Sequence, residues 1–453
     1  MISKKASFYT FSIYINTFLG ALQGIIAARL LDQYSMGYFS QIKVILSYLL
    51  MINFGIINGL LIVLPKADKQ KRMEYVSTAF WLSLGLYAVG AAAFLLVFFI
   101  TGDYVHLYIA LIFPIYGIKE VPVYIMRGKG DFRKLAIMYI LISSISFISI
   151  SAFIYFFKFK GALAALAFNV AAYLVLGIIT GRINIKFRII KDRAKELLKK
   201  GIYIYLIEFF RFIKRSMEKF VMIFIISREV YAVYTVGIVM VSFFDIMPST
   251  IFQYLLPDFI RENKKWSLEK MGAMISFVTV IMTVLLLCGM YAFTILVPLI
   301  IPGYEQSLSI FYLLTFTSLI NIWNYIIYNK FVSENKIKYM YISQFTGLFV
   351  LLGLIGLGYF IFNTDFSNII IIAALILTAR SSYIVSLVFL FIKKTKLNIL
   401  RTFSFPMTMI SILTIVLAIY LIYNFIHLLP LVIAVYIILF YRRFFKWKEQ
   451  LTL

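Results

Sequence analysis

The sequence predicts an all-α polytopic membrane protein with about fourteen transmembrane helices. Of its 453 residues, 63% are hydrophobic and only 14% are charged, whereas soluble domains are about 25% charged. Apolar runs of about 20 residues recur along the whole chain, and each is long enough to cross a hydrocarbon core of roughly 30 Å. These two observations exclude an ordinary soluble globular protein.

The apolar runs define fourteen spans, the first of which we expect to be retained because it is too long for a signal peptide and lacks a cleavage site. The last span is the shortest. The predicted spans are residues 9–31, 37–64, 76–100, 105–126, 135–157, 162–181, 202–226, 230–256, 271–300, 307–328, 339–361, 369–391, 403–425 and 427–441.

The distribution of basic residues orients these spans. With the N-terminus in the cytoplasm, 33 of the 44 Lys and Arg residues fall in the tails and inner loops and 3 in the outer loops. Such an asymmetry is a strong positive-inside signal and predicts that both termini are cytoplasmic. The net charge of +25 therefore requires no nucleic-acid partner, although it favours contact with anionic membrane lipids.

Two similar sets of six spans lie on either side of a basic, amphipathic linker at residues 182–201. Leu64-Pro65 and Leu256-Pro257 end equivalent spans, and the basic turn Arg127–Lys134 has a counterpart at Val332–Lys338. We therefore predict an N-terminal lobe, residues 1–181, and a parallel C-terminal lobe, residues 202–391, related by a pseudo-twofold axis along the membrane normal. Residues 392–453 hold two further spans and a cytoplasmic tail.

The seventh span, residues 202–226, carries six charged residues within about 140° of arc. Charged side chains in a membrane helix normally face a bundle interior or a water-filled cavity, so we predict that this face lines a basic substrate path. An internal ion-pair ladder without a ligand is the alternative. The six residues are Glu208, Arg211, Lys214, Arg215, Glu218 and Lys219.

Three further cations extend the candidate substrate site. Arg29 and Lys43, in the outer halves of the first two spans, either continue the basic path or reach out to the membrane interface. Arg380 lies midway along the twelfth span, which favours a substrate or pairing role. Lys119 and Glu120 are adjacent, so they point in directions about 100° apart, and a transport role is the lesser reading for them.

Uncharged and acidic residues within the spans have more than one reading. Asn58 either hydrogen-bonds between helices or binds substrate. Gly55 and Gly59 allow either bending or close packing. Asp245 lies near the middle of the eighth span, where a lone carboxylate can take up a proton or another cation. It is our candidate for ion coupling, and pairing with a cation of the seventh span is the alternative.

We expect neither a metal site nor a cofactor. His106 and His427 have no partners at the spacing of metal ligands, and Cys288 is the single cysteine.

Several segments resemble the oligosaccharide flippases, the polysaccharide transporter (Wzx-type) branch of the MOP exporter superfamily. The resemblance covers nearly the whole chain as a pattern of span spacing and small residues, without an invariant catalytic motif. The segments that carry it are Leu31–Phe39, Phe54–Leu60 with Pro65, the turn Arg127–Lys134, and Arg228–Pro257.

The resemblance implies a V-shaped, two-lobed transporter in the bacterial cytoplasmic membrane. It would move an undecaprenyl-pyrophosphate-linked oligosaccharide, such as an O-antigen or capsule repeat unit, from the inner to the outer leaflet by alternating access. Its partners would be the diphosphate headgroup of that substrate, membrane lipids, a coupling proton or sodium ion, and glycosyltransferases or the polymerase of the same pathway. It would not be an enzyme.

Three other functions compete with this one. A drug exporter of the related MATE branch moves mostly cationic compounds and should carry acidic residues at mid-membrane, whereas the seventh span is basic. A lipid II flippase of the MurJ type also handles a diphosphate, and the sequence pattern separates it poorly from the polysaccharide branch. A membrane polymerase for the same sugars would need a sizeable outer loop with acid–base residues, and the outer loops here are short.

Overall fold

The computed structural model is nearly all helical and describes residues 4–261, 268–333, 337–360, 369–395 and 404–452. The predicted all-α polytopic fold is confirmed, and the described residues of the predicted spans are mainly helical, with the second and fourth spans each divided among shorter helices. Within these described residues, eight helices are long and apolar enough to cross a membrane. The chain divides into two compact units, Met1–Phe224 and Ile225–Leu453.

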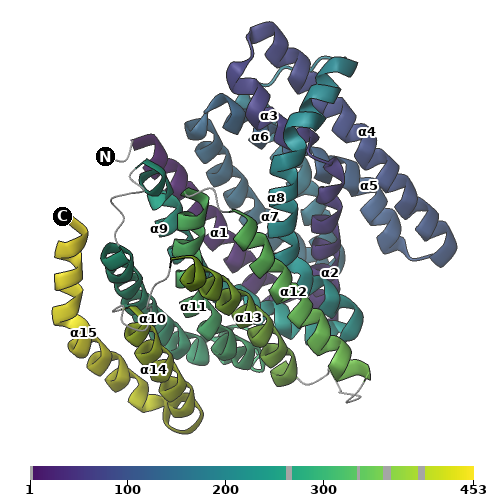
Figure 1. Ribbon diagram of the computed structural model, residues 1–453. Helices are drawn as coiled ribbons and strands as arrows, with labels where there is room; N and C mark the ends of the chain where they lie inside the picture. The colour runs from purple at the N-terminus through teal and green to yellow at the C-terminus, as the bar shows by residue number, and fades with distance from the viewer. Residues whose placement is uncertain (1–3, 262–267, 334–336, 361–368, 396–403, 453) are drawn as a thin grey trace. The chain divides into compact units, whose positions relative to one another are not determined.

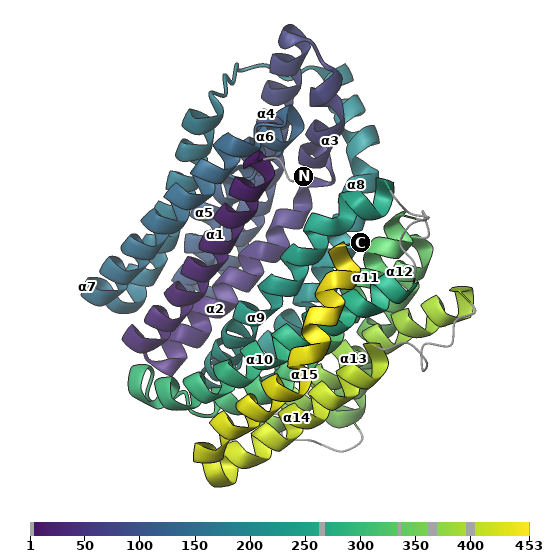
Figure 2. The same cartoon turned by 90° about the vertical axis from the view of Figure 1, so that its left-hand side faces the viewer.

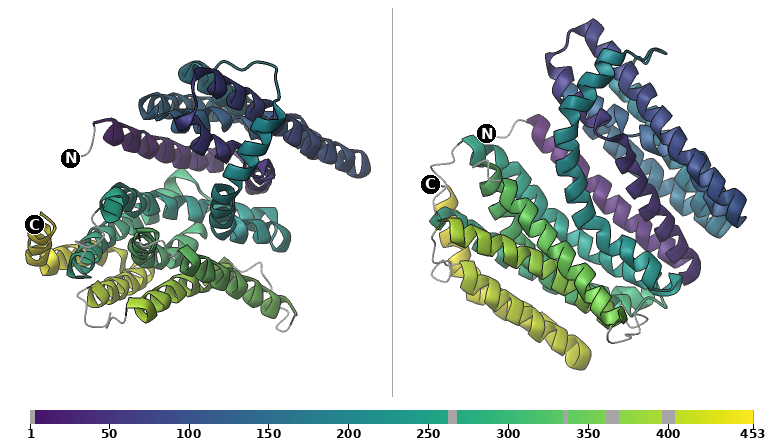
Figure 3. Two further views of the ribbon diagram at one scale, coloured as in Figure 1. Left: turned by 45° about the horizontal axis from the view of Figure 1, so that its top comes forward. Right: turned by 45° about the vertical axis from the view of Figure 1, so that its right-hand side comes forward.

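Unit 1 is built around its fourth predicted span, the pair α5–α6, which packs against α2, α3, α4 and α7. α7 consists of two helical segments joined at Lys158, whose backbone (φ 50°, ψ −130°) is not helical. Within unit 1, α4 and α5 lie side by side, as their labels show in Figure 1 and as the same two segments show in the right-hand view of Figure 3. The elements are α1 (Lys4–Leu30), α2 (Gln33–Leu49), η1 (Leu50–Asn53), α3 (Ile56–Val63), η2 (Leu64–Lys66), α4 (Lys69–Thr101), α5 (Tyr104–Ile118), α6 (Val121–Lys129), α7 (Phe132–Gly181) and α8 (Lys191–Ile225).

Unit 2 is built around α11, which packs against α9, α10, α13 and α14. α10 also packs against α14 and α15, the last two long helices of the chain (Figure 2). The elements are α9 (Arg228–Arg261), α10 (Leu268–Ile300), α11 (Ser307–Ser333), α12 (Ile337–Phe360), α13 (Ile369–Thr395), α14 (Ser404–Phe425), η5 (Ile426–Leu428) and α15 (Leu429–Thr452).

The predicted linker is a structured part of unit 1. Its first half is irregular and is tied to α4: the Lys186 backbone N–H donates to Ser77 Oγ at 2.9 Å, and that of Ile190 to Thr78 Oγ1 at 3.2 Å. Its second half is the start of α8, which continues into the seventh span without a break. The two units are divided after Phe224, later than the predicted linker. The pseudo-symmetric assignment of spans to lobes stays a prediction.

Candidate functional site

The second predicted span is interrupted at its centre. Between η1 and α3, Phe54 (φ 47°) and Gly55 (φ 90°) both adopt left-handed backbone conformations, which glycine tolerates and a bulky residue resists. The Asn53 side chain stabilises the interruption, because its Nδ2 donates to the Leu50 carbonyl at 3.0 Å and its Oδ1 accepts from the Gly55 N–H at 2.8 Å. The sequence prediction of one continuous helix over 37–64 is therefore wrong here.

Two tyrosines from neighbouring helices complete this interruption. The Tyr87 hydroxyl of α4 donates to the Leu50 carbonyl at 3.2 Å, and the Tyr205 hydroxyl of α8 donates to the Met51 carbonyl at 2.8 Å. Carbonyls that lose their helical partners are costly to bury unless other donors reach them. The break in the second span thus depends on side chains from two other helices.

The backbones of α3 and α8 touch beside the break. A Cβ added at Gly201 would lie 1.9 Å from the Gly55 carbonyl oxygen, and one added at Gly59 would lie 2.4 Å from the Leu197 carbonyl oxygen. Such distances leave no room for any side chain. Of the two readings of these glycines, Gly59 serves close packing, and Gly55 serves both packing and the turn of the chain.

The fourth predicted span is divided more mildly into α5 and α6, since Lys119 and Glu120 between them keep right-handed helical dihedrals. Lys119 and Glu120 lie between the two helices, and Pro122 occupies the first turn of α6, where its missing N–H costs nothing. Lys119 Nζ lies 3.7 Å from the centroid of the Tyr116 ring and 5.5 Å from that of Tyr173. Both distances suit cation–π attraction, which lowers the cost of holding this ammonium within the span.

Glu208 of α8 connects the two interrupted spans. Its Oε2 accepts hydrogen bonds from Asn58 Nδ2 of α3 at 2.5 Å and from the Tyr124 hydroxyl of α6 at 2.8 Å. Hydrogen bonds to an ionised carboxylate are roughly twice as strong as those between neutral groups. Of the two readings of Asn58, the structure shows the hydrogen bond between helices.

Tyr48 of α2 makes a second contact with α8. Its ring packs against Phe212 and Phe220, with centroids 4.9 and 4.4 Å away, and Ser216 Oγ donates to its hydroxyl at 3.0 Å. Together with Tyr205 and Glu208, these α8 residues recur every three or four positions, which places them on one side of the helix. We call Tyr205, Glu208, Phe212, Ser216 and Phe220 the contact face of α8.

Lys43 of α2 is repelled by the charges of two other lysines of unit 1. Lys43 is exposed, and the charges that act on it are those of Lys219, on α8, and of Lys119. Lys219 is half-buried and Glu218 beside it is 5% exposed. Lys43 and Lys219 are both predicted site residues, whereas Lys119 is one for which the sequence favoured no transport role.

The remaining predicted site residues are dispersed. Arg29 is exposed in the last turn of α1. Asp245 of α9 and Arg380 of α13 are half-buried in unit 2, and one carboxylate oxygen of Asp245 is buried. Arg211, Lys214 and Arg215 belong to α8, but their side chains lie outside the part of the chain that the structure describes, so their roles stay predictions.

Tyrosine hydroxyls and one serine are the site residues that sequence reasoning missed. Tyr48, Tyr87, Tyr124 and Tyr205 hydrogen-bond within unit 1, and the sequence analysis singled out none of them. One signal was available, because Tyr205, Glu208 and Ser216 recur at a spacing of three and eight residues and so lie on one side of α8. Within the described residues, no group of three His, Cys, Asp or Glu side chains could hold a metal ion.

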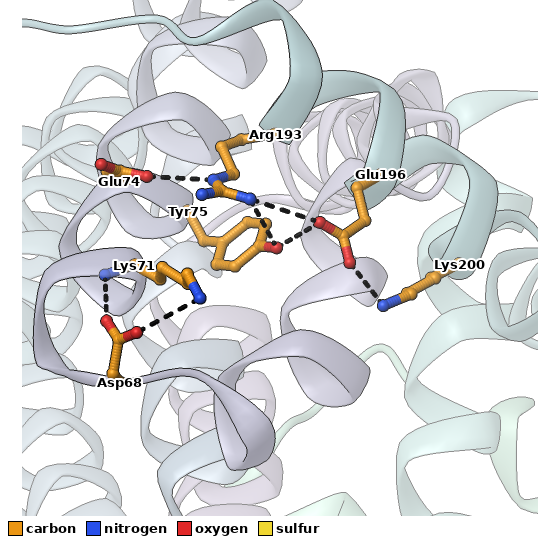
Figure 4. A network of polar contacts seen from close by, with 7 residues as sticks. All are labelled: Asp68, Lys71, Glu74, Tyr75, Arg193, Glu196 and Lys200. Atoms are coloured by element: carbon orange, nitrogen blue, oxygen red, sulfur yellow. Dashed lines mark hydrogen bonds and ion pairs between the residues drawn. The ribbon is translucent and has the colours of Figure 1, made fainter.

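A polar network fastens the start of α8 to α4 (Figure 4). Arg193 Nε donates to Glu74 Oε2 at 3.0 Å, the Tyr75 hydroxyl donates to Glu196, and Lys200 Nζ lies 2.5 Å from Glu196 Oε1. Hydrogen bonds from Lys200 and then Tyr75 lower the pKa of Glu196. An ionised Glu196 is therefore favoured in the folded protein.

No protein-family model and no curated protein matches the chain. Solved structures do. An inward-facing multidrug resistance MATE transporter of the MOP superfamily is 15% identical, with a TM-score of 0.65 over 83% of this chain and 93% of its own. The lipid II flippase MurJ, in an inward closed conformation, is 12% identical, with a TM-score of 0.69 over 97% and 98%.

The chain has the MOP-superfamily fold. A third structure, a MOP-superfamily transporter from Pyrococcus furiosus, is 17% identical, with a TM-score of 0.51 over 85% of this chain and 94% of its own. The fold expected from the sequence, that of a multi-pass helical membrane protein, is thus shown. At 12–17% identity these likenesses show the architecture alone.

Proposed function

We propose that this protein is a transporter that flips an undecaprenyl-pyrophosphate-linked oligosaccharide between membrane leaflets by alternating access. The observation that carries the proposal is α8, a helix of membrane length whose predicted span holds four cations and two acids. Its acid Glu208 accepts hydrogen bonds from Asn58 of α3 and Tyr124 of α6, and the charge of its cation Lys219 acts on Lys43. Lys and Arg are the natural partners of a diphosphate.

The interrupted spans support the conformational part of this proposal. Alternating access needs elements whose ends can reorient while their packed segments stay rigid. The left-handed pair Phe54–Gly55 and the junction at Lys119–Glu120 divide two spans of unit 1 into short rigid pieces. We infer that these junctions accommodate bending during transport, while Glu208 keeps both spans attached to α8.

The direct test measures flipping of the lipid-linked oligosaccharide in proteoliposomes. We expect Arg211→Ala, Lys214→Ala and Arg215→Ala each to reduce the rate, and Lys43→Ala with Lys219→Ala to reduce it further. The control is Lys158→Ala with Lys160→Ala, which removes two exposed lysines at the turn of α7. If the variant that combines Arg211→Ala, Lys214→Ala and Arg215→Ala flips the lipid at the normal rate and is present at normal abundance, the proposal is contradicted.

Lipid II is the second candidate substrate, because the likeness to its flippase covers 97% of this chain. It shares the diphosphate and differs in its sugars. Flipping of fluorescent lipid II and of the oligosaccharide lipid, measured in the same vesicles, separates the two. Export of cationic drugs by these vesicles would favour the MATE-type alternative, which the basic residues of α8 disfavour.

Asp245 is our proposed site of coupling to a proton or sodium ion, on the strength of its half-buried position within α9. Asp245→Asn should abolish the response of transport to an imposed pH or sodium gradient. Asn retains the size of the side chain and removes the charge. An unchanged response would exclude this residue. The other parts of the proposal are a bacterial plasma-membrane location with both termini cytoplasmic, and contact with glycosyltransferases or a polymerase.

A further inference from the structure

A hollow of about 750 Å³ lies along the first turns of α8, entirely within unit 1. It belongs to the stretch that precedes the predicted seventh span. Two acidic residues, Asp192 and Glu196, form part of its wall. The other residues that line it are Lys195, Lys199, Lys200, Ile62, Ile202 and Tyr203.

The charged part of the hollow is basic once its ion pairs are considered. Both oxygens of Glu196 are engaged, Oε1 by Lys200 and Oε2 by Tyr75 and Arg193, so this acid is already neutralised. Lys195 and Lys199 are exposed, and neither takes part in an ion pair within the described part of the chain. Apart from the ion pair of Glu196 and Lys200, the wall therefore carries two lysines, Lys195 and Lys199, and one acid, Asp192.

The other part of the hollow is apolar and lies where α8 enters its predicted span. Ile62 and Ile202 are half-buried, and Tyr203 is 73% exposed. Exposed aromatic residues next to lysines are characteristic of the membrane interface, where an apolar ring and a charged head find suitable surroundings. A single hollow thus offers cations at one end and apolar side chains at the other.

The walls of this hollow are held in place. The network of Figure 4 attaches α8 to α4, and the backbone contact of Gly201 with Gly55 attaches it to α3. A site whose cations are positioned before binding loses less entropy than a flexible basic tail would. This difference separates a defined site from general attraction between a basic segment and an anionic surface.

We propose that this hollow binds one anionic phospholipid. Lys195 and Lys199 contact its phosphate, and Ile62, Ile202 and Tyr203 pack against its glycerol and the first methylenes of a chain. Phosphate suits paired lysines, and each lysine near an anionic headgroup contributes binding energy. The proposal does not depend on which substrate is transported, so it can fail while the proposed function stands, and the reverse.

Native mass spectrometry of the full-length protein, titrated with phosphatidylglycerol or phosphatidylcholine, tests this site. We expect the wild type to retain one phosphatidylglycerol more tightly than phosphatidylcholine. Lys195→Gln with Lys199→Gln should weaken that binding about tenfold, as expected for the loss of two such contacts beside one acid. Lys199→Gln alone should have an intermediate effect, and it serves if the double variant is unstable.

Lys158→Gln with Lys160→Gln is the matched control, because it removes the same charge at a different place. These lysines lie at the turn of α7, and the whole second segment of that helix separates them from residue 182, where the linker to α8 begins. Equal weakening by the control pair would show general electrostatic attraction and overturn the proposal. Equal retention of phosphatidylcholine would do the same. Displacement of the lipid by millimolar inorganic phosphate would instead identify a site for free phosphate, which also contradicts a lipid site.

Discussion

The second and eighth predicted spans are counterparts in sequence but differ in backbone structure. Counted back from Leu64-Pro65 and Leu256-Pro257, Gly55 corresponds to Met247 and Asn53 to Asp245. The second span breaks at Gly55, whereas α9 runs from Arg228 to Arg261 as one helix. The difference follows from the residues at this position, because Gly55 suits a left-handed turn and its counterpart Met247 does not.

The fourth and tenth predicted spans differ in the same way. The fourth is divided at Lys119–Glu120, just before Pro122, whereas α11 is a continuous helix from Ser307 to Ser333 without proline. Similar span patterns therefore yield interrupted helices in unit 1 and continuous ones in unit 2. A break is stable only where neighbouring side chains satisfy the freed backbone groups, as Tyr87 and Tyr205 do in unit 1.

Gly201→Ala should produce the largest effect on this arrangement. The new Cβ would lie 1.9 Å from the Gly55 carbonyl oxygen, and backbone atoms cannot move aside as a side chain can. We expect a loss of about 3 kcal/mol or more in the free energy of unfolding, measured as a fall in melting temperature. Gly237→Ala, which meets mainly the Ile310 side chain in unit 2, should cost less. Gly85→Ala, with open space around it, should have little effect, and equal losses for all three would contradict the packing argument.

Gly55→Ala should destabilise the interrupted span by about 2 kcal/mol. Its φ of 90° is strained for any residue with a Cβ, at about 1–3 kcal/mol, and the Cβ would also lie 2.9 Å from the Gly201 carbonyl carbon. Thermal unfolding measures the loss. Gly20→Ala in α1, which meets no atom within 4 Å, is the control, and a neutral Gly55→Ala would show that the turn does not require glycine.

Tyr124→Phe should cost about 1–3 kcal/mol, because it removes a donor from the Glu208 carboxylate within unit 1. Tyr383→Phe in unit 2 removes a neutral hydrogen bond of the same length, 2.8 Å, to Asn324 Oδ1, and should cost about 1 kcal/mol. Unfolding of both variants measures the difference. In a double-mutant cycle with Asn58→Ala, Tyr124→Phe should be non-additive, since both donors serve one oxygen; strict additivity would argue against a shared acceptor.

Glu196→Gln should have the smallest effect, below about 1 kcal/mol, because its ion pairs are partly exposed. The folded state lowers the pKa of Glu196, so its contribution is present above the unfolded pKa of about 4.3 and disappears as pH falls through the folded value. The gap in melting temperature between wild type and variant should therefore be largest near pH 7 and should shrink as the pH falls below about 4.3. The control is Glu229→Gln, an exposed glutamate in the first turn of α9. A gap that widens on acidification would contradict the assignment.

Sequence reasoning located the helices well and the breaks poorly. The predicted span 369–391 lies within α13 (Ile369–Thr395), and 271–300 within α10 (Leu268–Ile300), because long apolar runs leave few alternatives in a membrane. The interruption at Phe54–Gly55 was not predicted, since a glycine in a span is equally suited to close packing. The turn is stabilised by Tyr87 and Tyr205, whose hydroxyls donate hydrogen bonds to the Leu50 and Met51 carbonyls. The sequence does not show that these tyrosines lie there.

The candidate site was identified in part. The charges of the seventh span drew attention to Glu208 and Lys219, but their partners were not predictable. Asn58 and Tyr124 are 150 and 84 residues away from Glu208, and no local periodicity connects them. Lys119 was given little weight because it and the adjacent Glu120 point in directions about 100° apart. Its cation–π neighbours Tyr116 and Tyr173 emerge only in the structure.

By itself, the sequence determined the all-helical membrane class, the order of the spans and the concentration of charge on α8, because hydropathy and charge act along the chain. The tertiary structure alone decided that α8 packs with unit 1 and that Glu208 joins two interrupted spans. These features depend on contacts between residues far apart in sequence. A buried carboxylate persists only where the fold brings it donors, and the fold, not the local sequence, chooses them.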